Sequence, residues 1–387
     1  MAQKETAVGK FFSSTPGRLG VLGVALLLLP AVFAPFIANG RPLLTVVGGR
    51  ISLPFLRHFF APSSSDYDVF AEVCFNYLAL FVPLGAIVWF AFRRARKLRG
   101  YLPAVLAAVL ILPFIFVDRR MDKRNFREAP LSPGEVRVFA PLPFSPFEQV
   151  GRPYEPPCAR HVLGCDSIGR DVAARLIYGA RTSLAVGIFS TAIALMIGTM
   201  IGTAAGYWRG WFDLAVMRAV EVLMCFPTFL LLLILMSTLS DRGGGASLQS
   251  IPLVIAVLGL TGWIGVAFLV RGETLKQCAM PYIQSCEVSG VSTWRIMFRH
   301  LLPNISPVLL TKGGLAVAGA IMAENGLSFL GFGVREPGAS WGELLQQAFT
   351  DPLAYWHLTL FPGAAIFLAV ISFNFIGEGI GKAISPK

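Results

Sequence analysis

Apolar runs of bilayer-crossing length recur along the chain and constrain its fold more than any other feature. A helix needs about 20 mainly apolar residues to cross the hydrocarbon core, and backbone polar groups in lipid must be satisfied within the segment itself. The predicted spans are Leu19–Ala38, Val73–Phe92, Tyr101–Val117, Ser183–Tyr207, Ala215–Leu239, Ile251–Val270, Leu309–Phe332 and Leu358–Ile380. The sequence therefore predicts an all-α, polytopic membrane protein with about eight transmembrane helices.

Composition and charge agree with a membrane protein. Hydrophobic residues make up 55% of the 387 residues, and charged residues only 14%, which is atypical of soluble globular domains. The net charge of +11 is compatible with a nucleic-acid-binding protein, but the cations stand at the ends of apolar runs instead of forming one patch. Cytoplasmic loops and anionic lipid headgroups account for them. We therefore expect membrane lipid, and not nucleic acid, as a partner.

Flanking cations predict the orientation. Met1–Arg18 and Arg93–Arg99 are basic and are expected inside, and so are the ends of the chain near Lys382. The first apolar run lacks a small-residue cleavage site and is interpreted as an uncleaved anchor. Between the first two spans, Asn39–Glu72 is expected to hold a small ordered segment outside. One segment conflicts with this predicted orientation. Asp118–Arg127 carries five cations, yet the order of the spans places it on the extracytoplasmic side.

A polar, partly basic segment, Arg271–Pro307, separates two of the apolar runs. It is predicted to be a cytoplasmic helical hairpin, with short helices over Tyr282–Ser289 and Val291–Leu302. Gly290 stands between them and permits a tight turn, because glycine reaches backbone angles closed to other residues. Pro303 and Pro307 are expected to break the chain before it re-enters the membrane.

This segment resembles the EAA loop of ATP-binding-cassette importer permeases. Leu302 and Pro303 follow Gly290 at the family's spacing, and GVSTWRIMFRHLLPN is similar to the C-type subunit of oligopeptide and dipeptide permeases. In that family the loop is a coupling helix that sits in a groove of the ATPase subunit. The family's Glu-Ala-Ala falls on Gln284-Ser285-Cys286, so the glutamate charge is lost. The resemblance implies ATPase-coupling roles for Gln284, Ser285, Cys286, Gly290, Arg295, Arg299, Leu302 and Pro303.

Two further segments resemble the same family. In HVLGCDSIGRDVAARLIYGARTSL, His161–Leu184, Cys165 replaces the threonine of the family's GTD-x-x-GRD pattern. We expect an interfacial helix here, with an Asp171–Arg175 pair at i,i+4 spacing. Asp166 and Asp171 are interpreted as structural and not as metal ligands. The second segment is GAIMAENGLSFLGFG, Gly319–Gly333.

Polar groups inside apolar runs are candidates for lining a solute translocation pathway. Glu324 and Asn325 lie deep in a predicted span, where an ionisable group is costly unless it faces a partner or water. A translocation pathway and helix packing are both open for them. Glu221 is expected near the cytoplasmic interface. Gly198 and Gly202 form a GxxxG pattern, which favours close helix packing, either within the subunit or at a dimer face.

The cysteines leave two alternatives open. Cys158 and Cys165 could form a disulfide in an oxidising compartment. With His161 they also supply three types of zinc-binding side chain, but a fourth ligand is missing. No metal site is therefore predicted.

Catalytic signatures are weak. No lysine is followed by serine or threonine, so the chain has no P-loop and is not expected to hydrolyse ATP. Gly338–Gly342 matches GxSxG, with Ser340 as nucleophile and His357 downstream, but such an elbow needs a strand before it and a helix after it. The same residues resemble the family's PSWG segment. An intramembrane serine hydrolase therefore stays an unfavoured alternative.

The resemblance implies a type I importer permease core with an inserted helix pair. The predicted divisions are residues 1–38 (N-terminus and first span), 39–182 (inserted region with two extra spans) and 183–387 (permease core with coupling loop 271–307). The inserted pair also resembles an extended variant associated with microcin-like peptides. A secondary transporter, the main rival, would need an inverted repeat, which we do not find.

The implied function is import of peptides or similar small solutes by alternating access, in the bacterial inner membrane with both termini cytoplasmic. The implied partners are two ATPase subunits carrying ATP and Mg²⁺, a B-type permease subunit and an extracytoplasmic solute-binding protein. No cofactor is expected on this chain itself.

Overall fold

The computed structural model describes residues 7–47, 50–54, 75–76, 79, 127, 135–242, 251–334 and 338–384. Two predicted spans, Val73–Phe92 and Tyr101–Val117, lie outside the described residues except at three positions. The basic segments Arg93–Arg99 and Asp118–Arg127 also lie outside them, apart from Arg127.

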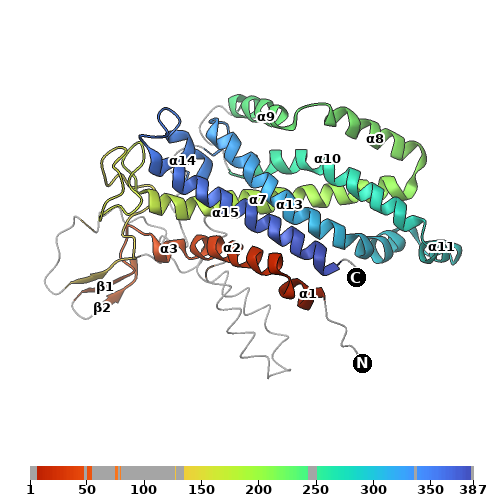
Figure 1. Ribbon diagram of the computed structural model, residues 1–387, viewed down its shortest axis with the longest axis horizontal. Coiled ribbons are helices and arrows are strands. Elements are labelled where there is room, and N and C mark those ends of the chain that lie inside the picture. Colours follow the sequence, from red (N-terminus) through yellow and green to blue (C-terminus); the bar gives the residue numbers. More distant parts are fainter. Residues whose placement is uncertain are drawn as a thin grey trace, which may run out of the picture. The chain divides into compact units, whose positions relative to one another are not determined.

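Helices dominate the described part of the chain (Figure 1). They are α1 (Ala7–Ser13), α2 (Thr15–Val32), α3 (Ala34–Ile37), α7 (Val172–Trp208), α8 (Gly210–Met224), α9 (Thr228–Arg242), α10 (Ile251–Cys278), α11 (Pro281–Val288), α12 (Thr293–Arg295), the π-helical turn η2 (Ile296–Leu301), α13 (Leu302–Phe329), α14 (Trp341–Gln347) and α15 (Trp356–Ile384). Within the described residues, 5 helices are long and apolar enough to cross a membrane, or up to 6 if α8 and α9 form one bent span. The all-α polytopic fold is confirmed, whereas the number of eight spans stays a prediction.

The chain divides into two compact units. Unit 1 comprises Met1–Leu26, Ser183–Val334 and Ala364–Lys387, and unit 2 comprises Leu27–Thr182 and Arg335–Gly363.

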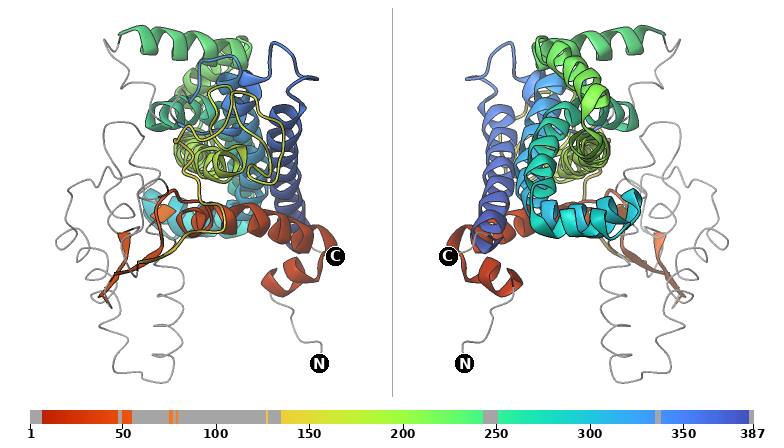
Figure 2. Two further views of the ribbon diagram at one scale, coloured as in Figure 1. Left: turned by 90° about the vertical axis from the view of Figure 1, so that its left-hand side faces the viewer. Right: turned by 90° about the vertical axis from the view of Figure 1, so that its right-hand side faces the viewer.

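Glycine stripes bring the helices of unit 1 into close contact, and α7, α10 and α13 run alongside one another there (Figure 2). A Cβ placed on Gly198 would lie 2.6 Å from Val266 Cβ, and one on Gly202 would lie 2.5 Å from the Ala267 carbonyl oxygen. Such close backbone approach is what small residues allow between helices in lipid. The GxxxG pattern of α7 therefore packs against α10 within the subunit.

Two expectations about helix boundaries were wrong. The segment before Ser183 is not a separate interfacial helix, because α7 is continuous from Val172 to Trp208. Conversely, the predicted span Ala215–Leu239 is broken, since α8 and α9 meet at a bend of 84°. Pro227 stands at this break, and it both lacks an N–H and disfavours helical angles at the residue before it.

Pro303 and Pro307 do not break the chain, contrary to expectation. A helical run extends from Thr293 to Phe329. Pro303 stands at the start of α13, directly after the π-helical turn η2, and the helical run continues through it. The N–H that Pro307 lacks would have bonded to the Pro303 carbonyl, and the Ser306 hydroxyl donates to that oxygen instead, at 2.7 Å.

Unit 2 contains a small antiparallel sheet with the strand order β2-β1-β3. Its strands are β1 (Leu44–Val47), β2 (Arg50–Ser52) and β3 (Val136–Val138). Two of them lie in the region between the first two predicted spans, where the sequence suggested a small ordered segment.

Candidate functional site

The candidate coupling segment is Pro281–Pro303, and its turn is closed by a glycine. Gly290 has φ +71°, and it follows α11 at the C′ position. The Gly290 N–H donates to the Glu287 carbonyl and the Val291 N–H to the Cys286 carbonyl, both at 3.0 Å. These two bonds define a Schellman motif, which requires a left-handed residue at C′. The tight turn predicted at Gly290 is confirmed.

A compact apolar cluster anchors the segment to unit 1. Ile283, Ile296 and Leu301 are fully buried. They pack with Cys278, Met297 and Ile305, and with the partly buried Tyr207 and Leu309. Burying one such side chain stabilises a structure by about 1.5–3 kcal/mol. The cluster joins α11, η2 and α13 to α10 through buried apolar contacts.

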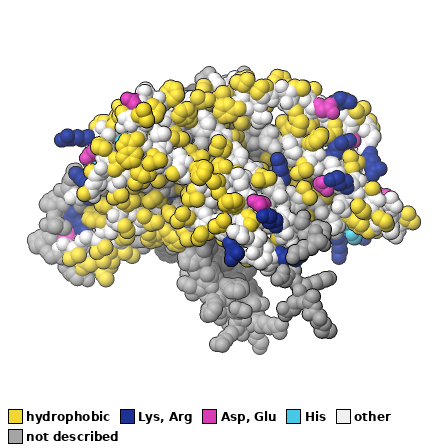
Figure 3. Space-filling view, in the orientation of Figure 1, with side chains coloured by type: hydrophobic (Ala, Val, Ile, Leu, Met, Phe, Trp, Pro, Cys, Tyr) yellow, Lys and Arg dark blue, Asp and Glu magenta, His cyan; other side chains and the backbone are white. Residues whose placement is uncertain are grey.

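The opposite side of the segment faces outward. Six of the eight predicted coupling residues are exposed: Gln284, Ser285, Gly290, Arg295, Arg299 and Pro303. Cys286 and Leu302 are half-buried. Large apolar side chains accompany them, since Val288 is 90% exposed and Trp294 62%. In unit 1, Lys and Arg side chains gather toward the α11 end (Figure 3). Exposed aromatic, aliphatic and Arg side chains together are typical of protein–protein contact surfaces.

An ion pair and a groove adjoin this segment. Arg271 of α10 binds Asp213 of α8 through two contacts, Nε–Oδ1 at 2.5 Å and Nη2–Oδ2 at 2.6 Å. Bidentate pairing of this kind is geometrically specific. Beside the segment, α7, α12, η2 and α13 line an apolar groove of about 570 Å³, with Met200, Trp294 and Phe298 on its walls.

Glu324 lies fully buried in α13 and is held by hydroxyl groups. Ser183 Oγ of α7 donates to Glu324 Oε2 at 2.9 Å, and Ser328 Oγ donates to Oε1 at 2.8 Å. Ser328 Oγ in turn accepts from the Val334 N–H at 3.1 Å. The neighbouring Asn325 donates to the Ile321 carbonyl at 2.7 Å. Of the two alternatives for Glu324, this geometry favours helix packing, because the carboxylate joins α7, α13 and the chain that follows α13.

Glu221 is not part of that cluster. It lies on α8, and its carboxylate pairs with Arg218 at 2.6 Å, with both side chains mostly exposed. A surface pair of this kind contributes little to stability.

Buried charges in unit 2 form a network that explains the polar motif before α7. Arg170 Nε lies 2.5 Å from Asp166 Oδ2, and Arg175 Nη2 lies 2.5 Å from Glu343 Oε2. Asp171 accepts from the Ala174 N–H at 2.9 Å and so caps α7. The predicted Asp171–Arg175 pair was wrong. Asp171 Oδ2 lies 2.9 Å from His161 Nδ1, and Arg175 pairs with Asp166 and Glu343 instead. Both aspartates make hydrogen bonds that hold the start of α7 and the loop before it.

Sequence reasoning missed Arg181, a fully buried residue of α7. Its guanidinium donates to the Ala31 carbonyl at 2.6 Å and the Val32 carbonyl at 3.1 Å. These are carbonyls of the last turn of α2, which have no partner within the helix. An arginine just before a predicted span was the available signal.

The geometry around Ser340 does not support a hydrolase. Ser340 is the N-cap of α14, and its Oγ accepts from the Glu343 N–H at 3.1 Å. His357 Nε2 lies 3.1 Å from a different group, the Cys165 carbonyl oxygen. A nucleophile must instead be activated by a base within hydrogen-bonding distance. Ser340 therefore caps a helix.

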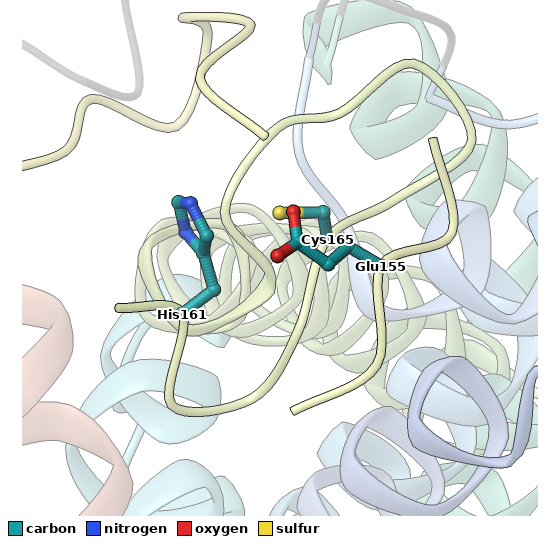
Figure 4. A group of neighbouring side chains, drawn as sticks. All are labelled: Glu155, His161 and Cys165. Atoms are coloured by element: carbon teal, nitrogen blue, oxygen red, sulfur yellow. The ribbon is translucent and has the colours of Figure 1, made fainter. Parts of the chain in front are cut away.

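The loop before α7 brings together Glu155, His161 and Cys165 (Figure 4). Burial raises the pKa of the Cys165 thiol to about 12. A hydrogen bond from the Arg152 N–H lowers the pKa of the Glu155 carboxyl.

Cys158 and Cys165 are free thiols in the structure, and a disulfide between them stays a prediction. Sequence reasoning missed Glu155, because a lone acid in a proline-rich loop carries no spacing signal.

Comparison with known proteins adds a family and several relatives. Residues 198–387 match the family model described as binding-protein-dependent transport system inner membrane component. The chain is 37% identical over 233 residues to the glutathione transport system permease protein GsiD of Pectobacterium atrosepticum, covering 60% of this chain and 75% of the relative. It is 39% identical over 233 residues to the dipeptide transport system permease protein DppC of Bacillus subtilis, covering 60% and 70%. The oligopeptide transport system permease protein OppC of Haemophilus influenzae is 37% identical over 227 residues, covering 59% and 70%.

Proposed function

This chain belongs to the inner-membrane permease components of binding-protein-dependent transport systems, and we propose that it serves an importer of peptides or similar small solutes. The relatives at 36–39% identity are permeases whose names specify glutathione, dipeptides or oligopeptides. Peptide bonds with free termini are the chemistry common to these three solutes. The solute assignment rests on this likeness alone.

The observation that carries the mechanism is the outward face of Pro281–Pro303. The Schellman motif at Gly290 closes the turn, and the cluster around Ile283 and Ile296 anchors it. A rigid helix with exposed apolar and Arg side chains is suited to sit in the groove of a soluble partner. When the partner subunits move, α11 moves with them, and α10 and α13 follow because they share the buried cluster.

We assign ATP and Mg²⁺ to separate ATPase subunits that contact Pro281–Pro303. Two such subunits, a B-type permease and an extracytoplasmic solute-binding protein would complete the transporter. Alternating access then requires that ATP and solute favour different arrangements of the same helices, since a ligand shifts an equilibrium only by its differential affinity for the two states. Both termini would be cytoplasmic, which places α11 on the ATPase side.

Within this scheme Glu324 is a packing residue. Its bond to Ser183 holds α7 against α13, so the two helices would move as one body during the transport cycle. Residues 183–387 would form the permease core, and residues 39–182 an insertion whose role is separate from coupling.

Cross-linking tests the coupling assignment directly. Two single-cysteine variants of the tagged chain would be compared in native membranes, one keeping Cys286 in α11 and the other keeping Cys225 at the α8–α9 bend. Cys225 is exposed and serves as the matched control.

We expect an ATPase subunit to be cross-linked through Cys286 and not through Cys225, and mass spectrometry of the purified complex to recover a second permease. If the chain were purified alone, with no ATPase attached at Cys286, the coupling assignment would be lost.

A further inference from the structure

Three metal-binding side chains converge in the loop before α7, in unit 2. A carboxylate oxygen of Glu155, a ring nitrogen of His161 and the sulfur of Cys165 all lie within 4.8 Å of one another (Figure 4). The three residues are close in sequence but do not follow a regular element. Backbone bonds shape the loop around them, including Cys165 N–H to the Glu155 carbonyl at 2.8 Å and Gly151 N–H to the Gly169 carbonyl at 2.9 Å.

Gly151 leaves space where the three atoms point. A Cβ placed on Gly151 would lie 2.3 Å from Cys165 Sγ, 3.0 Å from Glu155 Oε2 and 3.3 Å from His161 Nε2. Gly151 is not among the glycines of positive φ, so its backbone does not demand glycine. Zinc bonds to sulfur at about 2.3 Å and to nitrogen or oxygen at about 2.0–2.2 Å. A small inward movement of the His161 and Glu155 side chains would bring all three within bonding distance of one ion.

The tautomer of His161 suits a ligand. Its Nδ1 lies 2.9 Å from Asp171 Oδ2, so the carboxylate fixes the proton on Nδ1 and leaves the lone pair on Nε2. His161 is 1% exposed, and among the described residues its Nε2 has no hydrogen-bond partner. Buried polar atoms without a partner are rare. Metal-ligating histidines almost always donate their other ring N–H to a carboxylate or carbonyl in this way.

We propose that Glu155, His161 and Cys165 bind a zinc ion, with Cys158 as the fourth ligand. One thiolate, one imidazole and one carboxylate are the donor types that zinc accepts, whereas Ca²⁺ and Mg²⁺ select oxygen. Cys158 Sγ already lies 3.7 Å from Glu155 Oε1, and the Cys158 N–H is tied to the His161 carbonyl at 2.9 Å. A modest rotation of this half-buried side chain would complete a tetrahedral site.

The role of such an ion would be structural. It would join both arms of the 151–165 loop directly ahead of Asp166, whose carboxylate holds Arg170, and ahead of Asp171, which caps α7. The same four residues cannot serve both a zinc ion and a Cys158–Cys165 disulfide, because a disulfide consumes both thiolates. The two alternatives are therefore distinguishable by experiment.

The test uses the full chain, purified under reducing-agent-free conditions from native membranes with its partner subunits. After exposure to Zn²⁺ and removal of the excess, metal analysis should find one zinc per chain. Replacement with Co²⁺ should produce a thiolate-to-cobalt charge-transfer band that Zn²⁺ abolishes. This second measurement needs no variant and is unaffected by folding defects.

Three variants locate the site. Cys165→Thr introduces the residue that resembles the family pattern, Glu155→Gln removes only a charge, and Cys225→Ser is the control at an exposed cysteine elsewhere. Changes in outer-shell residues cost about 10–100-fold in metal affinity, so loss of a ligand should cost at least about tenfold. Cys225→Ser should bind zinc like the unaltered protein.

Three outcomes would overturn the proposal. The first is a cobalt spectrum without the charge-transfer band. The second is zinc binding that Cys165→Thr leaves unchanged. The third is a Cys158–Cys165 disulfide found by non-reducing peptide mapping of the freshly isolated protein.

Discussion

The turn at Gly290 permits a quantitative test of the coupling mechanism. Gly290 has φ +71°, and a Cβ placed there would meet no atom within 4 Å. Replacing Gly290 therefore creates no clash, and its cost comes from the backbone alone. For residues other than glycine, the left-handed conformation costs about 1–2 kcal/mol. Asparagine tolerates it better than most residues, and β-branched residues tolerate it least.

A closed turn weakened by about 1–2 kcal/mol loses roughly 5- to 30-fold in population relative to its open forms. If transport depends on this turn to transmit movement from the ATPase subunits, Gly290→Val should lower solute uptake by up to that factor. Gly290→Asn should lower it much less. Membrane insertion and assembly should be unchanged in both, because neither variant disturbs the cluster around Ile283.

The assay is ATP-dependent uptake of a labelled peptide into proteoliposomes holding the purified complex and its solute-binding protein. ATP hydrolysis is measured alongside uptake, and we expect Gly290→Val to retain hydrolysis that no longer drives transport. Unchanged uptake in Gly290→Val would refute the coupling role of the turn. Equal impairment by asparagine and valine would place the defect in contact with the partner and not in the backbone.

Three further predictions concern stability and chemistry. Glu324→Ala leaves two buried hydroxyl groups without their acceptor and should destabilise the purified protein by about 1–3 kcal/mol for each hydroxyl group. The measurement is the unfolding temperature in detergent, which should fall. An unchanged unfolding temperature would contradict the packing role. Gly202→Val forces a side chain against the Ala267 carbonyl oxygen, 2.5 Å from the Cβ position. It should lower the free energy of unfolding by about 1–3 kcal/mol or more. In the control Gly265→Val, the added Cβ meets nothing within 4 Å, so this variant should be tolerated. Ser340→Ala should lose about 1 kcal/mol with the helix cap, and the unaltered protein should not react with a fluorophosphonate probe; covalent labelling at Ser340 would restore the hydrolase alternative.

Much of the fold could be predicted because its determinants are local. Each long apolar run from Ser183 onward corresponds to helix in the structure, since length and hydropathy suffice to specify a span in lipid. The turn at Gly290 was equally local, because one residue between two short helical patterns had to reach a left-handed conformation. The family resemblance added the expectation of a coupling role, which no periodicity in Arg271–Pro307 could have supplied.

Helix ends and breaks depended on neighbours beyond the run itself. Pro227 breaks the chain between α8 and α9, whereas Pro307 does not break α13 because Ser306 supplies the missing donor. A proline carries the same local preference in both places. The local preference therefore does not decide the outcome: the chain bends by 84° between α8 and α9 and stays helical through Pro307.

The sequence by itself determined that this chain crosses a membrane as helices, where the glycine turn lies, and which segment resembles a coupling helix. Only the tertiary structure decided that Glu324 is bonded to Ser183 on another helix, and that Glu155 joins His161 and Cys165 at a single point beside Gly151. Hydropathy acts on each segment independently and can be read along the chain. Convergence of polar groups depends on how loops close and helices pack, and that information is distributed over residues far apart in sequence.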